Sequence, residues 1–316
     1  MAELEPHENF DGVRFVNKAR GFDSPSQLPD SDDLARTWQA ANKTWWERSP
    51  MRYDWRDAIP YAEGTREYFD LIDSRFLEAV RHYLPWRSHA FEQLIPYDEL
   101  GNMDVLEIGV GHGTHAQLIA PHCRSFVGID LTERAVNVTR LRLAMAGIGG
   151  TVHQMDAEKM TFPDGTFDFI WSWGVIHHSS DTQKVIREMA RVLRPGGTAS
   201  LMVYFRSPLW YYLFHGLGKG LFRGEFLSVG GVHRINQLAT DGALARFFSV
   251  SEFKKLLADL FVIEKLRVTG QKMDAIPLPH GPVKTYLVQN VSDTFTRFVT
   301  NSLRLGTFLI VNVRRT

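Results

Sequence analysis

Hydrophobic positions in the first hundred residues follow the spacing of helices. Within the stretch 65–84, apolar side chains recur at intervals of three or four residues, which places them on one face of a helix. These side chains belong to Phe69, Ile72, Phe76, Val80 and Tyr83. The sequence therefore predicts a helical N-terminal region over residues 1–100, with one buried face on this helix.

Beyond residue 100 the pattern changes to short apolar runs separated by helical stretches, which is typical of βαβ units and a mostly parallel sheet. Between the second and third runs, Thr132 is placed to cap a helix that ends at Gly147. Two later runs, 261–270 and 307–316, are predicted to form a closing antiparallel pair. The pattern thus predicts an α/β fold, a Rossmann-like, doubly wound, mostly parallel seven-stranded sheet whose last strand is antiparallel. The first five strands are expected at 103–109, 125–130, 150–156, 167–173 and 197–205.

The segment 206–248 follows the fifth predicted strand and is rich in aromatic residues and glycine. Its glycines should prevent one rigid helix and permit a mobile lid. The expected division is a helical N-terminal extension or lid over 1–100 and a second domain over 101–316. That domain would comprise a cofactor-binding core over 101–205, this cap insertion, and closing helices and strands over 249–316.

Charge and cysteine content narrow the classes of function. The 316 residues include 36 Lys and Arg against 36 Asp and Glu, so no overall field would hold a nucleic-acid backbone, and nucleic acid is not an expected partner. A single cysteine, Cys123, excludes an intramolecular disulfide framework and a zinc site of two or more thiolates. The opening residues lack the basic and apolar stretches of a secretory signal, and these features together predict a cytoplasmic protein.

The most apolar window of the chain, 208–229, does not have the pattern of a membrane span. It is interrupted by His215, Lys219 and Arg223 and by several glycines, which is too broken for a bilayer-spanning helix. Lys219 and Arg223 lie four residues apart and would suit an anionic surface, so transient contact with a membrane surface is compatible with the sequence. The oligomeric state is left open.

Candidate chemistry begins where the first predicted strand ends. Gly109, Gly111 and Gly113 stand at the turn into a helix, where backbone N–H groups can approach a ligand closely. This spacing alone leaves a nicotinamide oxidoreductase open, but a dehydrogenase fingerprint asks for glycine where Thr114 stands. Glu107 precedes the glycines at a position that is usually apolar in dehydrogenases, and could order the loop or meet a cationic ligand group.

Acidic residues also end the next two predicted strands. Asp130 follows Gly109 by about 20 residues, the distance at which such folds place an acid on ribose hydroxyls. Asp156 ends the third strand, where an adenine ring would lie. With Glu107, three acids at consecutive strand ends favour a nucleoside-binding site over scattered surface carboxylates.

Five motifs follow one another along residues 101–205. They are EIGVGHG (107–113), GIDLT (128–132), MDAEKMTFPDGTFD (155–168), WGVIHHSSD (173–181) and VLRPGGTASL (192–201). As an ordered set they resemble the motifs of class I S-adenosylmethionine-dependent methyltransferases, in particular the small-molecule group that includes ubiquinone and sterol methyltransferases. The resemblance implies an enzyme with S-adenosylmethionine as its cofactor. The flanking regions match far less, and in this family they choose the substrate.

The resemblance also implies roles for residues at the cofactor. Backbone groups of the three glycines would hold its methionine part, with Glu107 ordering that loop. Carbonyl groups at Ser172 or Trp173 would meet its ammonium group.

At the nucleoside, the resemblance implies that Asp130 takes both ribose hydroxyls and that Leu131 covers one adenine face. Asp156 would accept a hydrogen bond from the adenine amino group, and Ala157 would supply a nearby backbone N–H.

Two adjacent histidines, His177 and His178, follow the fourth predicted strand. Free histidine titrates at about pH 6.5, so either could remove a proton from the acceptor. His178 is preferred because it is closer to the segment that faces the substrate, and a structural role for one or both is the alternative. No metal site is expected, because the acids of a magnesium site are not evident near Trp173.

Aromatic residues on either side of the core are candidates for acceptor binding. Tyr53 and Trp55 come from the N-terminal region, and Tyr211 and Tyr212 come from the cap insertion; packed aromatic clusters without acceptor contact are the alternative. The predicted function is methyl transfer to a small organic acceptor, lipophilic or aromatic, with oxygen favoured over carbon or nitrogen. A non-catalytic S-adenosylmethionine-binding scaffold is the rival hypothesis, since a fold does not establish a function.

Overall fold

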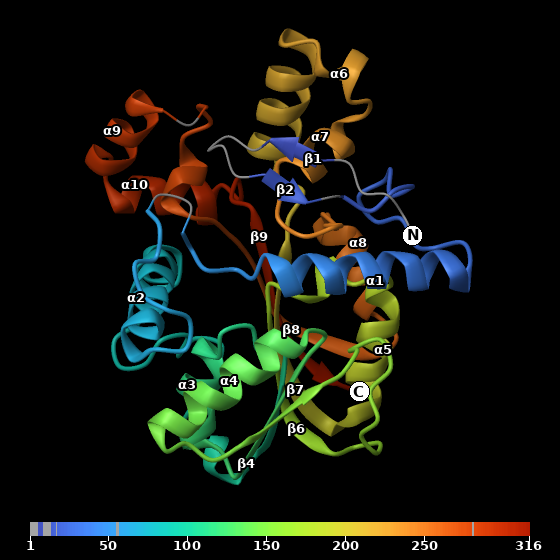
Figure 1. Cartoon of the computed structure of the whole chain (residues 1–316), viewed down its shortest axis with the longest axis vertical. Coiled ribbons are helices and arrows are strands. Elements are labelled where there is room, and N and C mark those ends of the chain that lie inside the picture. The colour runs from blue at the N-terminus through green and yellow to red at the C-terminus, as the bar shows by residue number, and fades with distance from the viewer. Residues whose placement is uncertain (1–5, 9–13, 17, 55–56, 280) are drawn as a thin grey trace.

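The computed structural model describes residues 6–8, 14–16, 18–54, 57–279 and 281–316. A seven-stranded sheet in the order β5-β4-β3-β6-β7-β9-β8 forms the centre of the molecule (Figure 1). Strands β5 to β7 in this order pair in parallel, and β9 runs antiparallel to both of its neighbours. The predicted fold class, with its antiparallel last strand, is therefore confirmed. The strands are β3 (Asp104–Ile108), β4 (Ser125–Asp130), β5 (Thr151–Gln154), β6 (Phe167–Trp173), β7 (Leu193–Tyr204), β8 (Phe261–Thr269) and β9 (Phe308–Arg315).

Buried side chains form one hydrophobic layer on each face of the sheet. In β3, Val105 belongs to one layer and the next residue, Leu106, belongs to the other. Because successive strand residues point to opposite faces and both faces are covered, the central strands read as continuous apolar runs. The first layer is shared with α2 (Arg66–Tyr83), α3 (Thr114–Ile119) and α4 (Glu133–Ala146), and the second with α5 (Thr182–Val192) and α8 (Val250–Leu257).

Local capping signals explain where two predicted helices begin and end. Thr65 caps α2, where its hydroxyl accepts the N–H of Tyr68 at an N to O distance of 3.3 Å, and all five apolar residues of the predicted face are buried. Thr132 caps α4 in the same way, and Gly147 ends that helix in the left-handed conformation with φ +65°. Both helices therefore form where the sequence predicted them.

The N-terminal region is docked on the core but is not entirely helical. Strands β1 (Pro6–Glu8) and β2 (Arg14–Val16) form a short antiparallel pair, which the helical prediction missed. Helix α1 (Asp32–Arg48) lies across the molecule beside the carboxyl ends of the parallel strands (Figure 1). The Glu47 carboxylate at its end accepts the N–H groups of Glu133 and Arg134, each at 3.1 Å, so it caps the positive end of α4.

The cap segment is more regular than the sequence suggested. The expectation that glycines prevent one continuous helix is wrong, because Gly216, Gly218 and Gly220 all lie inside one π-helix. The glycines allow close packing instead: a Cβ on Gly220 would lie 2.4 Å from the Phe226 ring, and one on Gly216 would lie 3.2 Å from Val232. The segment comprises this π-helix, η4 (Pro208–Phe222), with α6 (Glu225–Ser228) and α7 (Val232–Leu238).

The chain between β8 and β9 forms several short helices. Helix α10 contacts α2, and α9 lies further toward the end of the molecule that also carries α6 and α7 (Figure 1). Within the described part of the chain, every helix is too short or too polar to span a bilayer. The short helices are η5 (Lys272–Ala275), α9 (Pro282–Asn290), α10 (Asp293–Arg297) and η6 (Phe298–Ser302).

Candidate active site

A cavity of about 1820 Å³ lies at the carboxyl ends of the parallel strands. In open α/β sheets, ligands bind at this edge where the strand order reverses, which here is between β3 and β6. The loop after β3 and the ends of β4 and β6 form one side of the cavity, and residues of α1, η4 and α9 line it from other directions. Its volume exceeds the upper range of about 1,000 Å³ for a single small-ligand pocket.

The glycine loop is built for close approach of a ligand. Gly109, Gly111 and Gly113 all adopt positive φ, at +80°, +52° and +77°. A Cβ on Gly109 would lie 2.2 Å from a methyl of Val175, so only glycine fits there, whereas one on Gly111 would meet nothing within 4 Å. The loop thus presents bare backbone toward the cavity before α3 begins.

Glu107 lies fully buried behind this loop. Among the described residues, neither of its carboxylate oxygens has a hydrogen-bond partner, and Oε1 lies 3.6 Å from Nδ1 of His115. Burial raises the pKa of this carboxyl well above its usual range, and the nearby Asp130 carboxylate adds to the rise. The sequence did not single out His115, whose ring lies between those of Phe76 and Trp171.

Asp130 ties the glycine loop to the end of β4. Its Oδ2 accepts the N–H of Gly111 at 3.2 Å, and its Oδ1 accepts the N–H and hydroxyl of Thr132 at 2.9 and 2.8 Å. Burial raises the pKa of Asp130, while these hydrogen bonds oppose the rise. Leu131 follows directly and also lines the cavity.

Asp156 and Ala157 line the same cavity, where α1 approaches the end of β5. Oδ1 of Asp156 accepts the side-chain N–H of Gln39 at 2.9 Å and the backbone N–H of Glu158 at 2.9 Å. The Gln39 carbonyl in turn accepts the N–H of Ser180 at 3.2 Å. Gln39 was not predicted, because its partner lies more than a hundred residues away along the chain.

Ser172 and Trp173 are the last two residues of β6. Trp173 lines the cavity and stacks on Trp171 with ring centroids 5.3 Å apart. Ser172 is fully buried, is not among the residues that line the cavity, and its hydroxyl has no hydrogen-bond partner among the described residues. The two side chains therefore differ in their access to a ligand.

The two histidines also differ. His177 is fully buried, is not among the residues that line the cavity, and neither ring nitrogen has a hydrogen-bond partner among the described residues. His178 lines the cavity, and its Nδ1 lies 2.8 Å from the carbonyl oxygen of Leu244. A carbonyl only accepts, so Nδ1 carries the proton and Nε2 keeps a lone pair. Burial lowers the pKa of His178 to about 4.

Residues that were not predicted hold His178 in place. Asn42 of α1 donates a hydrogen bond to its backbone carbonyl. The Trp46 ring meets its imidazole edge-on at 4.9 Å, and a Cβ on Gly242 would lie 2.4 Å from Nδ1. The imidazole is thus enclosed by α1 and by the segment after α7.

The four predicted acceptor residues fall into three groups. Tyr53 and Tyr211 both line the cavity. Tyr53 stacks on Phe76 with centroids 5.1 Å apart, and Tyr211 is buried beside Phe247. Tyr212 is 49% exposed and is not among the lining residues. Trp55 lies outside the described residues.

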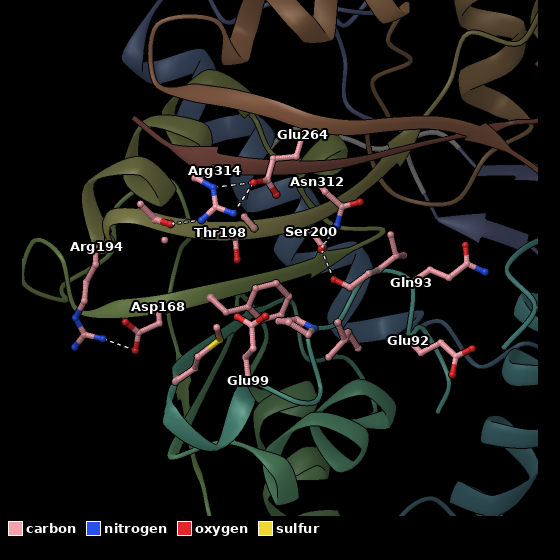
Figure 2. A pocket seen from close by; sticks show the side chains of 18 of the residues that line it. Glu92, Gln93, Glu99, Asp168, Arg194, Thr198, Ser200, Glu264, Asn312 and Arg314 are labelled. Carbon is pink, nitrogen blue, oxygen red and sulfur yellow. Dashed lines mark hydrogen bonds and ion pairs between the residues drawn. The ribbon is translucent and has the colours of Figure 1, made fainter. Parts of the chain in front are cut away.

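A second, smaller hollow of about 480 Å³ lies near the start of β7 (Figure 2). Both of its arginines are paired with carboxylates: Arg194 pairs with Asp168 at 2.5 Å, and Arg314 pairs with Glu264 at 2.5 Å. Among the described residues, no group of three or more His, Cys, Asp or Glu side chains could hold a metal ion. The large cavity is therefore the candidate active site.

The strand order, the glycine loop and the position of the cavity define the chain as a doubly wound, Rossmann-like α/β protein with a ligand site at the switch point. Residues 106–201 match a family model described as a methyltransferase domain. The resemblance noted in the motifs is thereby confirmed. Members of that family use S-adenosylmethionine as methyl donor, which confirms the predicted cofactor at the level of the family.

Relatives of known name match the same part of the chain. The uncharacterised methyltransferase YcgJ of Bacillus subtilis is 35% identical over 102 residues, which cover 32% of this chain and 40% of that protein. The 27-O-demethylrifamycin SV methyltransferase of Amycolatopsis mediterranei is 32% identical over 159 residues, covering 46% and 58%. A ubiquinone biosynthesis O-methyltransferase of Pseudomonas aeruginosa is 33% identical over 120 residues, covering 38% and 51%. The chain therefore spans about half the length of the curated relatives it matches.

Solved structures with a similar fold include the YcgJ protein and a [4+2]-cyclase. The YcgJ crystal structure aligns with a TM-score of 0.46 and 20% identity over 70% of this chain and 96% of that one. The [4+2]-cyclase SpnF aligns with a TM-score of 0.48 and 15% identity over 92% and 98%.

Proposed function

We propose that this protein transfers a methyl group from S-adenosylmethionine to an oxygen of a small organic acceptor. The observation that carries this proposal is the convergence of the glycine loop, Asp130, Asp156 and the imidazole of His178 on one cavity. The volume of the cavity leaves room for a second ligand beside a nucleoside cofactor. The names of two relatives that specify oxygen favour this atom over carbon or nitrogen.

The residues at the cofactor end suit S-adenosylmethionine. Asp130 would bind the ribose hydroxyls, and Oδ2 of Asp156, which accepts no hydrogen bond from the described residues, would take the adenine amino group. Glu107 is a buried carboxyl without a hydrogen-bond partner among the described residues, close behind the loop that would hold a cationic methionine part. Leu131, Ala157 and Trp173 supply the remaining walls.

The chemistry asks little of the protein beyond alignment and proton removal. The cofactor supplies a methyl group already activated by its sulfonium. The chain must hold the acceptor oxygen about 3 to 3.5 Å from that methyl and in line with the breaking S–C bond. As the new O–C bond forms, the hydroxyl proton passes to Nε2 of His178, whose opposite nitrogen donates to Leu244.

The flanking segments are proposed to choose the acceptor. The N-terminal extension contributes Tyr53 and Trp46, and the cap insertion contributes Tyr211, so both would close over the cofactor-binding core. A lipophilic or aromatic acceptor fits these walls.

Methyl transfer with a labelled donor tests this proposal. The protein would be incubated with S-adenosylmethionine carrying a radioactive methyl group and with a panel of hydroxylated aromatic and lipophilic compounds, and label in the extracted products would be counted. We expect micromolar binding of S-adenosylhomocysteine by calorimetry and labelled product from some panel members. Tight cofactor binding without any product would favour the scaffold hypothesis, and absence of cofactor binding would exclude both.

A further inference from the structure

Helix α9 at one wall of the cavity has an inverted pattern of burial. Val283 is 68% and Tyr286 is 64% exposed, whereas Lys284 is only 4% exposed. Lysine is among the residues least often buried, because desolvating its ammonium group costs free energy. A helix that buries its one lysine while Val283 and Tyr286 are exposed therefore needs a reason for that orientation.

The surroundings of Lys284 do not neutralise it. Its Nζ lies 4.2 Å from the centre of the Trp210 ring, and among the described residues no carboxylate lies within 4.0 Å and no acceptor hydrogen-bonds it. The Asp274 carboxylate acts on Lys284 only through its charge, which raises the lysine pKa. Oδ2 of Asp274 already accepts the Thr307 hydroxyl at 2.6 Å and the Gln271 N–H at 2.9 Å. Burial lowers the pKa of Lys284 to about 8, so the ammonium form still predominates at neutral pH.

The same wall offers a rigid apolar surface beside this charge. The Trp210 indole N–H donates to the backbone carbonyl of Asp274 at 2.7 Å, which fixes the ring against η5. His215, one turn further along η4, is kept neutral because burial lowers its pKa to about 4. Lys284, Trp210 and His215 all line the large cavity, as do the glycine loop and His178.

We propose that Lys284 binds a carboxylate of the methyl acceptor while Trp210 packs against the adjoining carbon skeleton. The acceptor would then be a hydroxylated organic acid, held by its anionic group at one end of the cavity and methylated at the other. This inference rests on the proposed function and specifies its substrate class. It explains why an ammonium without an ion-pair partner among the described residues is kept where a methionine side chain would pack at lower cost.

A second lysine in the same cavity provides a matched control. Lys272 also lines the cavity, but its Nζ is 2.7 Å from Oδ1 of Asp293 and its side chain is 26% exposed. A charge that is already paired contributes little to binding an added anion. Lys272→Met should therefore leave acid binding within about threefold of the unchanged protein, since exposed pairs are weak.

The test compares one acid with its neutral analogue. Binding of 6-hydroxy-2-naphthoate and of 6-hydroxy-2-naphthamide would be measured by calorimetry on protein saturated with S-adenosylhomocysteine. We expect the acid to bind at least about tenfold more tightly than the amide, as a charge-assisted contact allows. Lys284→Met should abolish that preference, and Lys284→Arg should restore most of it. Equal affinity for acid and amide, no binding of the acid, or an unchanged preference in Lys284→Met would overturn the assignment.

A further measurement covers the case of a misfolded variant, and the pattern of results separates failure of this inference from failure of the proposed function. Should Lys284→Met fail to fold, the pKa of Lys284 in the unchanged protein, followed by NMR of labelled lysine, must rise when the acid binds, and an unmoved pKa overturns the proposal. Failure of the proposed function would show differently, as a protein that does not bind S-adenosylhomocysteine or methylates nothing in the panel. Methylation confined to neutral acceptors would refute only the role of Lys284.

Discussion

The proposed cofactor side and the proposed acceptor side of the cavity are built in different ways. On the proposed cofactor side, residues come from consecutive strand ends, and Asp130 and Asp156 each accept the N–H of a residue two positions further along the chain. These strand-end residues are Glu107, Gly109, Gly111, Gly113, Asp130 and Asp156. On the acceptor side, α1, η4 and α9 meet through contacts between residues far apart in sequence, such as Asn42 with His178 and Trp210 with Asp274.

This difference separates what the fold requires from what the substrate requires. A parallel sheet with a glycine turn after its first strand creates the cofactor side wherever it occurs. The acceptor side depends on added helices that can change without disturbing the sheet. Mutations on the two sides should therefore separate into effects on cofactor affinity and effects on acceptor turnover.

The strongest test of this separation is at His178, where the two sides meet. His178→Ala should lower the rate of methyl transfer by about 10²-fold, as expected for loss of a positioned base, and leave cofactor affinity within a fewfold. Because its pKa is about 4, the imidazole is neutral above that pH, so His178 should give no pH dependence of turnover between pH 6 and 8. Single-turnover rates and calorimetry measure both quantities.

His177→Ala serves as the control for this variant, because His177 does not reach the cavity. Full turnover in His178→Ala would remove that residue from the mechanism. The large loss appearing in His177→Ala alone would transfer the role to His177.

A smaller effect is expected at Asp130, and it should fall on cofactor affinity rather than on acceptor turnover. Asp130→Ala should weaken binding of S-adenosylmethionine at least about tenfold, because each charge-assisted hydrogen bond contributes roughly 1.5 to 3 kcal/mol. The loss should exceed that in Asp156→Ala, because Asp130 also holds the N–H of Gly111 in the loop. Calorimetry on the folded variants gives the affinities, and an unchanged affinity in Asp130→Ala would contradict its assignment to the ribose.

The smallest expected effect concerns stability at Glu107. Its raised pKa means that the folded protein binds this proton more tightly than the unfolded chain, so stability is lost as pH rises above about 4.5 toward the folded pKa. Glu107→Gln cannot ionise, and its Tm without cofactor should exceed that of the unchanged protein by at least about 2 °C at pH 8. The gain should shrink toward pH 5.

The exposed Glu78 provides a control, since Glu78→Gln should not shift the Tm in this pH-dependent way. Thermal unfolding followed by circular dichroism at both pH values measures the effect. A Glu107→Gln variant that is destabilised at pH 8 would show that the buried carboxylate is not a source of instability.

The sequence predicted the sheet and the cofactor side because their signals are local. Strand ends, the caps at Thr65 and Thr132, and the motif from Glu107 to Gly113 can each be recognised within a few residues. The π-helix of the cap could not be predicted in the same way. Gly216 and Gly220 look like helix breakers until α7 and α6 are seen packing against them.

The sequence also could not predict the contacts made by Gln39, Asn42 and Lys284. Each depends on a partner more than sixty residues away along the chain, and burial of Lys284 in particular contradicts its usual preference for the surface. The local sequence pattern does not show which residues far apart along the chain will come into contact. Two tyrosines named from the cap illustrate the same limit, since the adjacent Tyr211 and Tyr212 point to opposite environments.

The placement of β9 between β7 and β8 has a consequence for biosynthesis. A ribosome releases β7 and β8 before β9, yet these two strands do not pair with each other and both hydrogen-bond to β9. Until β9 emerges, β7 keeps one open edge and β8 has no partner strand on either edge, and open edges invite pairing with other chains. The five-stranded parallel half can form during translation, whereas closure of the sheet must wait for release of Phe308–Arg315. Nascent chains stalled before β9 should consequently be the most aggregation-prone and the most dependent on chaperones.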